Sequence, residues 1–262
     1  IGEQLEINRV EEDLKYLRQL SGIVNADYRI DTIGNEAELT FRIEEAMTLF
    51  PVINFGGIRN NFWFQLGVTE ANLFGRGSQV TAFYRNNDDR HNFNLYYRVP
   101  FIRGSKWGAS FNILRWASVE PIYFDDALVF YNLDNNSFAG SIFYQFKGNH
   151  YVEFGGTYFQ ESFRKASRHD NEVTPGPDEI EQPKTLAKLI YQINEIDYHY
   201  FYLNGFSNQL NIEAVLNIDD GTWFNLMLND TKYFKRIGKK GNLALRLRLG
   251  LSTNNDNPFA PF

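Results

Sequence analysis

The chain has 262 residues, a formal net charge of -6 and an isoelectric point near 5.3. This acidic balance argues against a nucleic-acid partner, which would require a basic patch. The sequence has no cysteine, which excludes disulfide bonds, thiol catalysis and cysteine-ligated metal sites. Aromatic residues make up 16% of the chain, with 24 Phe and 15 Tyr, and this composition favours strands over helices.

No run of residues approaches the roughly 18 apolar positions of a membrane helix. The mean hydropathy is -0.41. Neither observation tests for a transmembrane β-barrel, because its strands are apolar on one face only and its loops are polar. The first residues lack a basic n-region and a start methionine, so we expect a mature segment or a fragment.

The first 46 residues predict a small α+β unit. Residues 8 to 20 carry apolar side chains at spacings of three and four, which is typical of an amphipathic helix, and Asn8 is its expected N-cap. The apolar stripe consists of Val10, Leu14, Leu17 and Leu20. After Gly22, the sequence predicts two strands around a turn at Gly34.

From residue 47 to residue 262 the sequence predicts only strands, about eleven in number. In residues 242 to 254, a leucine stands at every second position from Leu243 to Leu251, and Arg246 and Arg248 fill two of the places between. Successive side chains of a strand point to opposite faces. One face of this strand is therefore leucine, and the other carries both arginines.

The connections between the strands have two lengths. Short glycine-containing turns alternate with mostly longer loops, and the longest loop, residues 165 to 184, is charged and carries three prolines. An outer-membrane barrel typically shows this asymmetry of its connections. It also has strands of about ten residues and aromatic residues near the strand ends, as this sequence does. A soluble β-sandwich, which alternates with its apolar face inward, is the alternative.

We find no catalytic or metal-binding constellation in the sequence. The four histidines are dispersed, and neither a nucleophile elbow nor a phosphate-binding glycine loop is present. The acidic pairs at 125–126 and at Glu179 and Glu181 are expected to be solvated loop charge. Residues 217 to 223 fit a hairpin turn better than a calcium loop. We therefore predict a protein that is not an enzyme and has no cofactor and no metal.

The stretch GVTEANLFGRGSQVTAFYR, residues 67 to 85, resembles part of the BamA/TamA superfamily of outer-membrane assembly proteins. It matches the second strand, the first periplasmic turn and the third strand of that family's barrel. The turn residues are Leu73, Phe74, Gly75, Arg76 and Gly77. Residues 51 to 58 are similar to the first barrel strand. The helix and hairpin before them resemble the end of a polypeptide-transport-associated (POTRA) domain, whose final strand matches residues 41 to 46.

The resemblance implies a mainly β protein. Residues 1–46 would be the C-terminal part of a POTRA domain, and residues 47–262 the first part of a transmembrane antiparallel β-barrel that is truncated near the sixth external loop. The family barrel has sixteen strands. An odd number of strands, about eleven here, cannot close an antiparallel barrel and would leave two bare edges. The Arg-Gly motif of the sixth loop is also not found. We therefore expect this chain to be the first part of a longer protein.

The function that the resemblance implies is the insertion of proteins into the outer membrane through a lateral gate. The first strand would pair weakly with the last, so that its free N–H and C=O groups could template an incoming strand. The gate residues would be Asn54, Phe55, Gly56 and Gly57. Adjacent glycines also fit a bulge or a bend. Arg246 and Arg248 are predicted to face the lumen.

The implied location is the bacterial outer membrane, with the POTRA part in the periplasm. The implied partners are outer-membrane lipid and unfolded outer-membrane protein clients, with accessory lipoproteins as further candidates. The other functions to be weighed are a two-partner-type secretion pore, a barrel linked to a patatin-like lipase and a soluble β-sandwich binding module.

Overall fold

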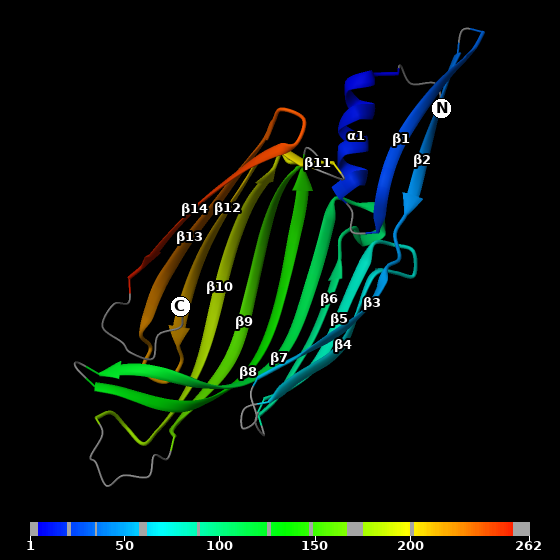
Figure 1. Cartoon of the computed structure of the whole chain (residues 1–262). Coiled ribbons are helices and arrows are strands. Elements are labelled where there is room, and N and C mark those ends of the chain that lie inside the picture. Colours follow the sequence, from blue (N-terminus) through cyan, green and yellow to red (C-terminus); the bar gives the residue numbers. More distant parts are fainter. Residues whose placement is uncertain are drawn as a thin grey trace.

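The computed structural model describes residues 5–19, 22–34, 36–57, 62–87, 90–124, 127–146, 149–166, 175–199 and 202–253. These residues form a small α+β unit and one large curved antiparallel sheet (Figure 1). No helix in this part of the chain is long and apolar enough to cross a membrane.

The α+β unit consists of one helix packed against a two-stranded hairpin. Its elements are α1 (Ile7–Gln19), β1 (Ile23–Ile33) and β2 (Glu36–Glu45). The helix begins one residue earlier than the sequence suggested, and Asn8 lies inside it rather than at the cap. The reason is that the carbonyl of Glu6 already accepts the N–H groups of Arg9 and Val10. Val10 and Leu14 are buried, as the apolar stripe predicted, while Leu20 lies outside the described residues.

The large sheet is a meander in which each long strand pairs with the next one in the chain. Its strands are β3 (Leu49–Gly56), β4 (Trp63–Leu73), β5 (Ser78–Asn87), β6 (Arg90–Val99), β7 (Trp107–Phe124), β8 (Ala127–Phe146), β9 (His150–Lys165), β10 (Glu179–Asn194), β11 (Asp197–His199), β12 (Tyr202–Asn217), β13 (Trp223–Ile237) and β14 (Gly241–Ser252). The three-residue β11 pairs only with β12, so the path from β3 to β14 holds eleven strands, as predicted. A short 3-10 turn, η1 (Ile102–Gly104), connects β6 to β7. Within the described residues the sheet does not close on itself, which confirms a partial barrel.

One sequence prediction about a strand boundary is wrong. Glu179 and Glu181 were expected in a loop, but they belong to β10, where Glu179 lies opposite Arg164 of β9. Pairing with the long β9 extends β10 beyond the point where its apolar alternation ends. Asp125 and Asp126 lie outside the described residues.

The outward face of the sheet is apolar and exposed. One row of directly paired residues runs over six strands and consists of Ile113, Phe138, Tyr158, Thr185, Leu216 and Trp223. The five leucines of β14 belong to the same face and are 38 to 66% exposed. An exposed apolar band that runs across the strands of a sheet requires an apolar medium. This arrangement fits contact with lipid.

The opposite, concave face carries polar residues, many of which are buried. These include Asn92, Ser141, Glu153, Glu161, Lys184 and Asn217. A soluble sandwich would bury its apolar face against a second sheet and expose its polar face. The described residues show the reverse, so the sandwich alternative is wrong.

Candidate functional site

The first strand of the sheet has one open edge. β3 pairs with β4 over eight residues, from Leu49 opposite Glu70 to Gly56 opposite Trp63. No strand among the described residues pairs with its other edge. An unpaired edge presents backbone N–H and C=O groups that can accept another strand. Of the predicted gate residues, Asn54 is exposed and Phe55 points outward with 73% of its surface exposed.

The two predicted gate glycines have different structural roles. Gly56 keeps the strand register, and the ring of Trp63 covers it so closely that a Cβ on Gly56 would lie 3.0 Å from the ring. The guanidinium group of Arg85 stacks on that ring at 4.3 Å from its centroid. Gly57 has φ +104° and directly follows the end of β3. Gly56 thus serves packing, and Gly57 allows a bend.

The predicted turn at residues 73–77 connects β4 to β5, next to the α+β unit. Phe74, Gly75 and Gly77 all have φ between 58° and 67°. The Asn72 carbonyl accepts the N–H of Gly75 at 2.9 Å, and its side-chain Oδ1 accepts the N–H of Gly77 at 2.7 Å. Arg76 is exposed, and Phe74 is 83% exposed. The glycines therefore determine the turn geometry, and Asn72 closes it.

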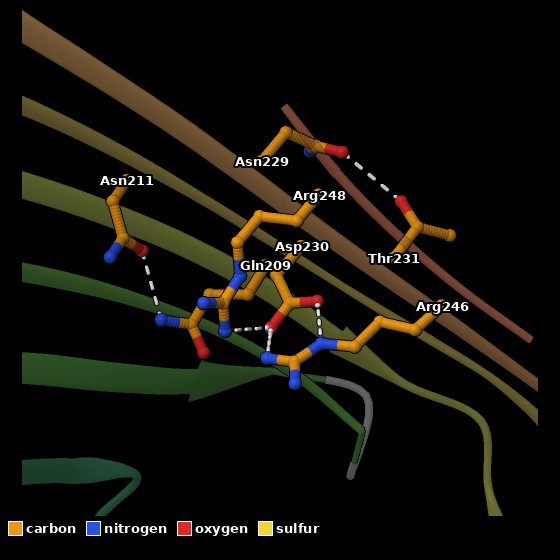
Figure 2. A network of polar contacts seen from close by, with 7 residues as sticks. All are labelled: Gln209, Asn211, Asn229, Asp230, Thr231, Arg246 and Arg248. Atoms are coloured by element: carbon orange, nitrogen blue, oxygen red, sulfur yellow. Dashed lines mark hydrogen bonds and ion pairs between the residues drawn. The ribbon is translucent and has the colours of Figure 1, made fainter. Parts of the chain in front are cut away.

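Arg246 and Arg248 share one carboxylate on the concave side of β13 and β14. Arg246 donates through Nε to Asp230 Oδ1 at 2.8 Å and through Nη2 to Oδ2 at 2.5 Å, and Arg248 Nη2 donates to Oδ2 at 3.3 Å (Figure 2). Figure 2 shows Asn229 and Thr231 on the other side of the ribbon. The lumenal role of the two arginines stays a prediction. Their position opposite the leucine row supports it.

Two further ion pairs connect β9 to β10 on the same concave face. Lys184 Nζ lies 2.6 Å from Glu161 Oε2, and the two side chains are only 2% and 7% exposed. Lys188 Nζ lies 2.8 Å from Glu153 Oε1, which is also buried. Nothing in the sequence separated these residues from ordinary surface charge. Their partners become apparent only from the register between the two strands.

The turn at residues 218–222 uses one of its two acidic side chains, that of Asp220, internally. Asp220 Oδ1 accepts the backbone N–H and the hydroxyl of Thr222, and Oδ2 accepts the side-chain amide of Asn217. The hydrogen bonds from Thr222 hold the pKa of Asp220 below its ordinary value. This is the geometry of a turn. Within the described ranges, no group of His, Asp and Glu side chains could hold a metal ion.

The family model described as "Omp85 superfamily domain" matches residues 72–260. The chain belongs to the Omp85 superfamily. β-barrels of this superfamily are outer-membrane proteins, and its members are transporters and assembly factors for other outer-membrane proteins. The predicted resemblance to the BamA/TamA superfamily is thereby confirmed.

Two solved structures show the same fold as this Omp85 chain. One is BamA from Haemophilus ducreyi lacking POTRA domains 1-3, with 17% identity and a TM-score of 0.56, and 97% of this chain and 51% of that chain are covered. The other is CdiB from Acinetobacter baumannii, with 12% identity and a TM-score of 0.60, and 98% and 49% are covered. The chain thus spans about half the length of each. Comparison with curated proteins gives no match.

The first turn of this Omp85 barrel gives a direct test of its glycines. Replacing Gly77 with alanine is expected to destabilise the protein by about 1–2 kcal/mol, because a Cβ is disfavoured in the left-handed region. Gly77 has φ +67°. Gly140→Ala is the matched control, since Gly140 has no positive φ and a Cβ there meets nothing within 4 Å. Urea unfolding of the full-length protein in detergent measures both, and equal losses would contradict the role of the turn.

Proposed function

We propose that this Omp85 chain assembles proteins in the outer membrane through a lateral gate at β3. The observation that carries the proposal is the open edge of a strand that pairs over only eight residues and ends next to the bend at Gly57. The interior hairpin of β7 and β8 is paired over eighteen residue positions. β3 is thus held far less firmly than the strands at the centre of the sheet.

The edge can act as a template because the surrounding medium cannot replace a strand partner. In hydrocarbon no water is present to satisfy backbone groups, so an unpaired strand is costly and a client strand that adds to it stabilises both. Ile53 and Phe55 of β3 point outward and are exposed. A client strand with the same alternation would continue the apolar surface without interruption.

The orientation belongs to the same proposal. The α+β unit, which we assign to the end of a POTRA domain, lies at the end of the sheet that carries the turns at residues 73–77 and 238–240 (Figure 1). We place this end in the periplasm. The long β7–β8 hairpin and the loop before β10 would then face the cell exterior. Unfolded outer-membrane proteins are the proposed clients.

A cross-linking experiment tests the gate. The chain has no native cysteine, so a single introduced cysteine is unique within it. In the full-length protein, Asn54→Cys is expected to form a disulfide with a cysteine in the terminal strand of a client barrel during assembly. Asn112→Cys is the control, because Asn112 belongs to β7, which is paired on both edges. Equal yields at the two positions, or none at Asn54→Cys, would refute the gate.

Secretion through the lumen is the second candidate function. It is favoured by the fold similarity to CdiB, with a TM-score of 0.60. On the concave side, the Tyr131 hydroxyl donates to the carbonyl of Pro177 at 2.8 Å, which ties the loop before β10 to β8. Tyr131→Phe removes the hydrogen bond that holds this loop. It is expected to raise secretion through the lumen and to leave assembly at β3 unchanged.

A further inference from the structure

The hairpin of β13 and β14 concentrates positive charge in an otherwise acidic chain. Residues 229 to 253 contain seven cations and a single acid, Asp230, while the whole chain has a net charge of -6. The cations are Lys232, Lys235, Arg236, Lys239, Lys240, Arg246 and Arg248. Such a local excess points to an anionic partner.

Three of these cations lie where the outward face meets the short-turn end. Lys235 pairs with Leu243, so it belongs to the row of outward leucines. Lys239 and Lys240 form the turn after Gly238, whose φ is +57°. All three lysines are exposed, as is the outward Ile237 nearby. Apolar surface and ammonium groups therefore adjoin at one level of the barrel wall.

Three of the other four cations of the hairpin are already engaged. Arg236 stacks on the ring of Tyr202 at 4.3 Å and donates to the carbonyl of Gly238. Arg246 and Arg248 bind Asp230. By contrast, none of Lys235, Lys239 and Lys240 makes an ion pair with a residue in the described part of the chain. Their charges are available to an external anion.

We propose that Lys235, Lys239 and Lys240 bind the phosphate groups of anionic phospholipids in the periplasmic leaflet. The inference rests on the orientation given in the proposed function. Lys235 can lay its aliphatic stem along the apolar surface of Leu243 and raise its ammonium group to the level of the headgroups. Ile237 and Leu243 contact the acyl chains of the same lipid.

A lipid fits this surface better than the acidic α+β unit does. That unit contacts the sheet at the opposite edge, where Gly22 lies beside Asn72 and Thr48, and its helix α1 also lies against β11. Lys235 points away from the barrel wall into the region of the exposed leucines, where a phospholipid is the natural neighbour. The connection between β10 and β12, at the same end of the sheet, carries Glu195 and Asp197. The basic surface is thus local to one hairpin.

Lipid retention by the full-length protein tests the proposal. The protein is purified in detergent with equal amounts of phosphatidylglycerol and phosphatidylethanolamine, and bound lipids are counted by native mass spectrometry at low ionic strength. The wild-type protein is expected to favour phosphatidylglycerol. Each basic residue near an anionic surface contributes about fivefold, so the variant Lys235→Gln/Lys239→Gln/Lys240→Gln should lose about a hundredfold of this preference.

Two controls match the substitutions in charge. The first control is Lys232→Gln, which removes a cation of the same strand from the concave face, where Lys232 lies opposite Arg246. Lys232→Gln should leave the preference for phosphatidylglycerol unchanged, and Lys235→Gln should lower it. Arg103→Gln/Lys106→Gln removes two cations from the turn between β6 and β7 and is compared with Lys239→Gln/Lys240→Gln. Equal losses in variants and controls would reduce the effect to net charge and overturn the proposal.

The remaining outcomes are also decisive. Retention of lipopolysaccharide but not phosphatidylglycerol would overturn the proposal and indicate the opposite orientation. If the triple lysine variant keeps the lipid preference but changes chemical cross-linking between the turn at residues 238–240 and α1, the lysines bind the acidic unit, and the proposal is overturned. If phosphatidylglycerol binds as expected while Asn54→Cys yields no client cross-link, the lipid site stands and only the proposed gate fails.

Discussion

Replacing Leu247 with arginine is expected to lower the free energy of unfolding in a bilayer by about 2–4 kcal/mol, because a charge on the lipid face near the midplane has no water around it. Leu247 lies in the middle of β14, is 57% exposed and faces Thr231 across the strand pair. Its neighbours on the same face are Leu245 and Leu249. Urea unfolding of the full-length protein in lipid vesicles measures the loss.

The matched control is the same new side chain on the other face. Asn211 of β12 lies opposite Leu228 on the concave side. Asn211→Arg is expected to change stability by less than about 1 kcal/mol, as most substitutions at polar surface positions do. The reverse result, a large loss at Asn211→Arg and little at Leu247→Arg, would place the leucines in a protein interior. The membrane assignment would then fail.

The division of the strands into two faces was predictable because it needs only a period of two. The alternation from Leu243 to Leu251 survives in the structure as an exposed row, and Arg246 and Arg248 lie on the other side. A pattern of this kind is local, so no knowledge of the neighbouring strands is required. The helix at residues 8 to 20 was found for the same reason. Its first residue was missed because a backbone carbonyl, not the Asn8 side chain, begins the hydrogen-bond pattern.

The contacts between strands were not predictable, because they depend on register. Asp230 became the partner of Arg246 and Arg248 through the short turn at residues 238–240, which sets how β13 and β14 align. Likewise, the role of Gly56 is visible only once Trp63 is known to lie directly opposite. A glycine in a strand can mark a bulge, a bend or a close approach, and only the neighbouring residue shows which of these applies.

The partnership of Glu161 with Lys184 shows the same dependence on register and leads to the second large effect. The two residues are separated in the chain by the long loop between β9 and β10, yet pairing of these strands brings Lys184 Nζ to 2.6 Å from Glu161 Oε2. In a charged pair that is removed from water, each charge is stabilised by the other. Loss of one member leaves the other buried and uncompensated.

Lys184→Ala is therefore expected to destabilise the full-length protein by about 3–5 kcal/mol. The double variant Glu161→Gln/Lys184→Met removes both charges while it keeps the side-chain volumes, and it should recover most of this loss. Denaturant unfolding in detergent compares the two. Arg246→Ala is the contrast, since the Arg246 side chain is half exposed and Arg248 remains paired with Asp230. If Lys184→Ala costs no more than Arg246→Ala, the concave wall around Glu161 is wet, and its ion pairs contribute little to the stability of the barrel.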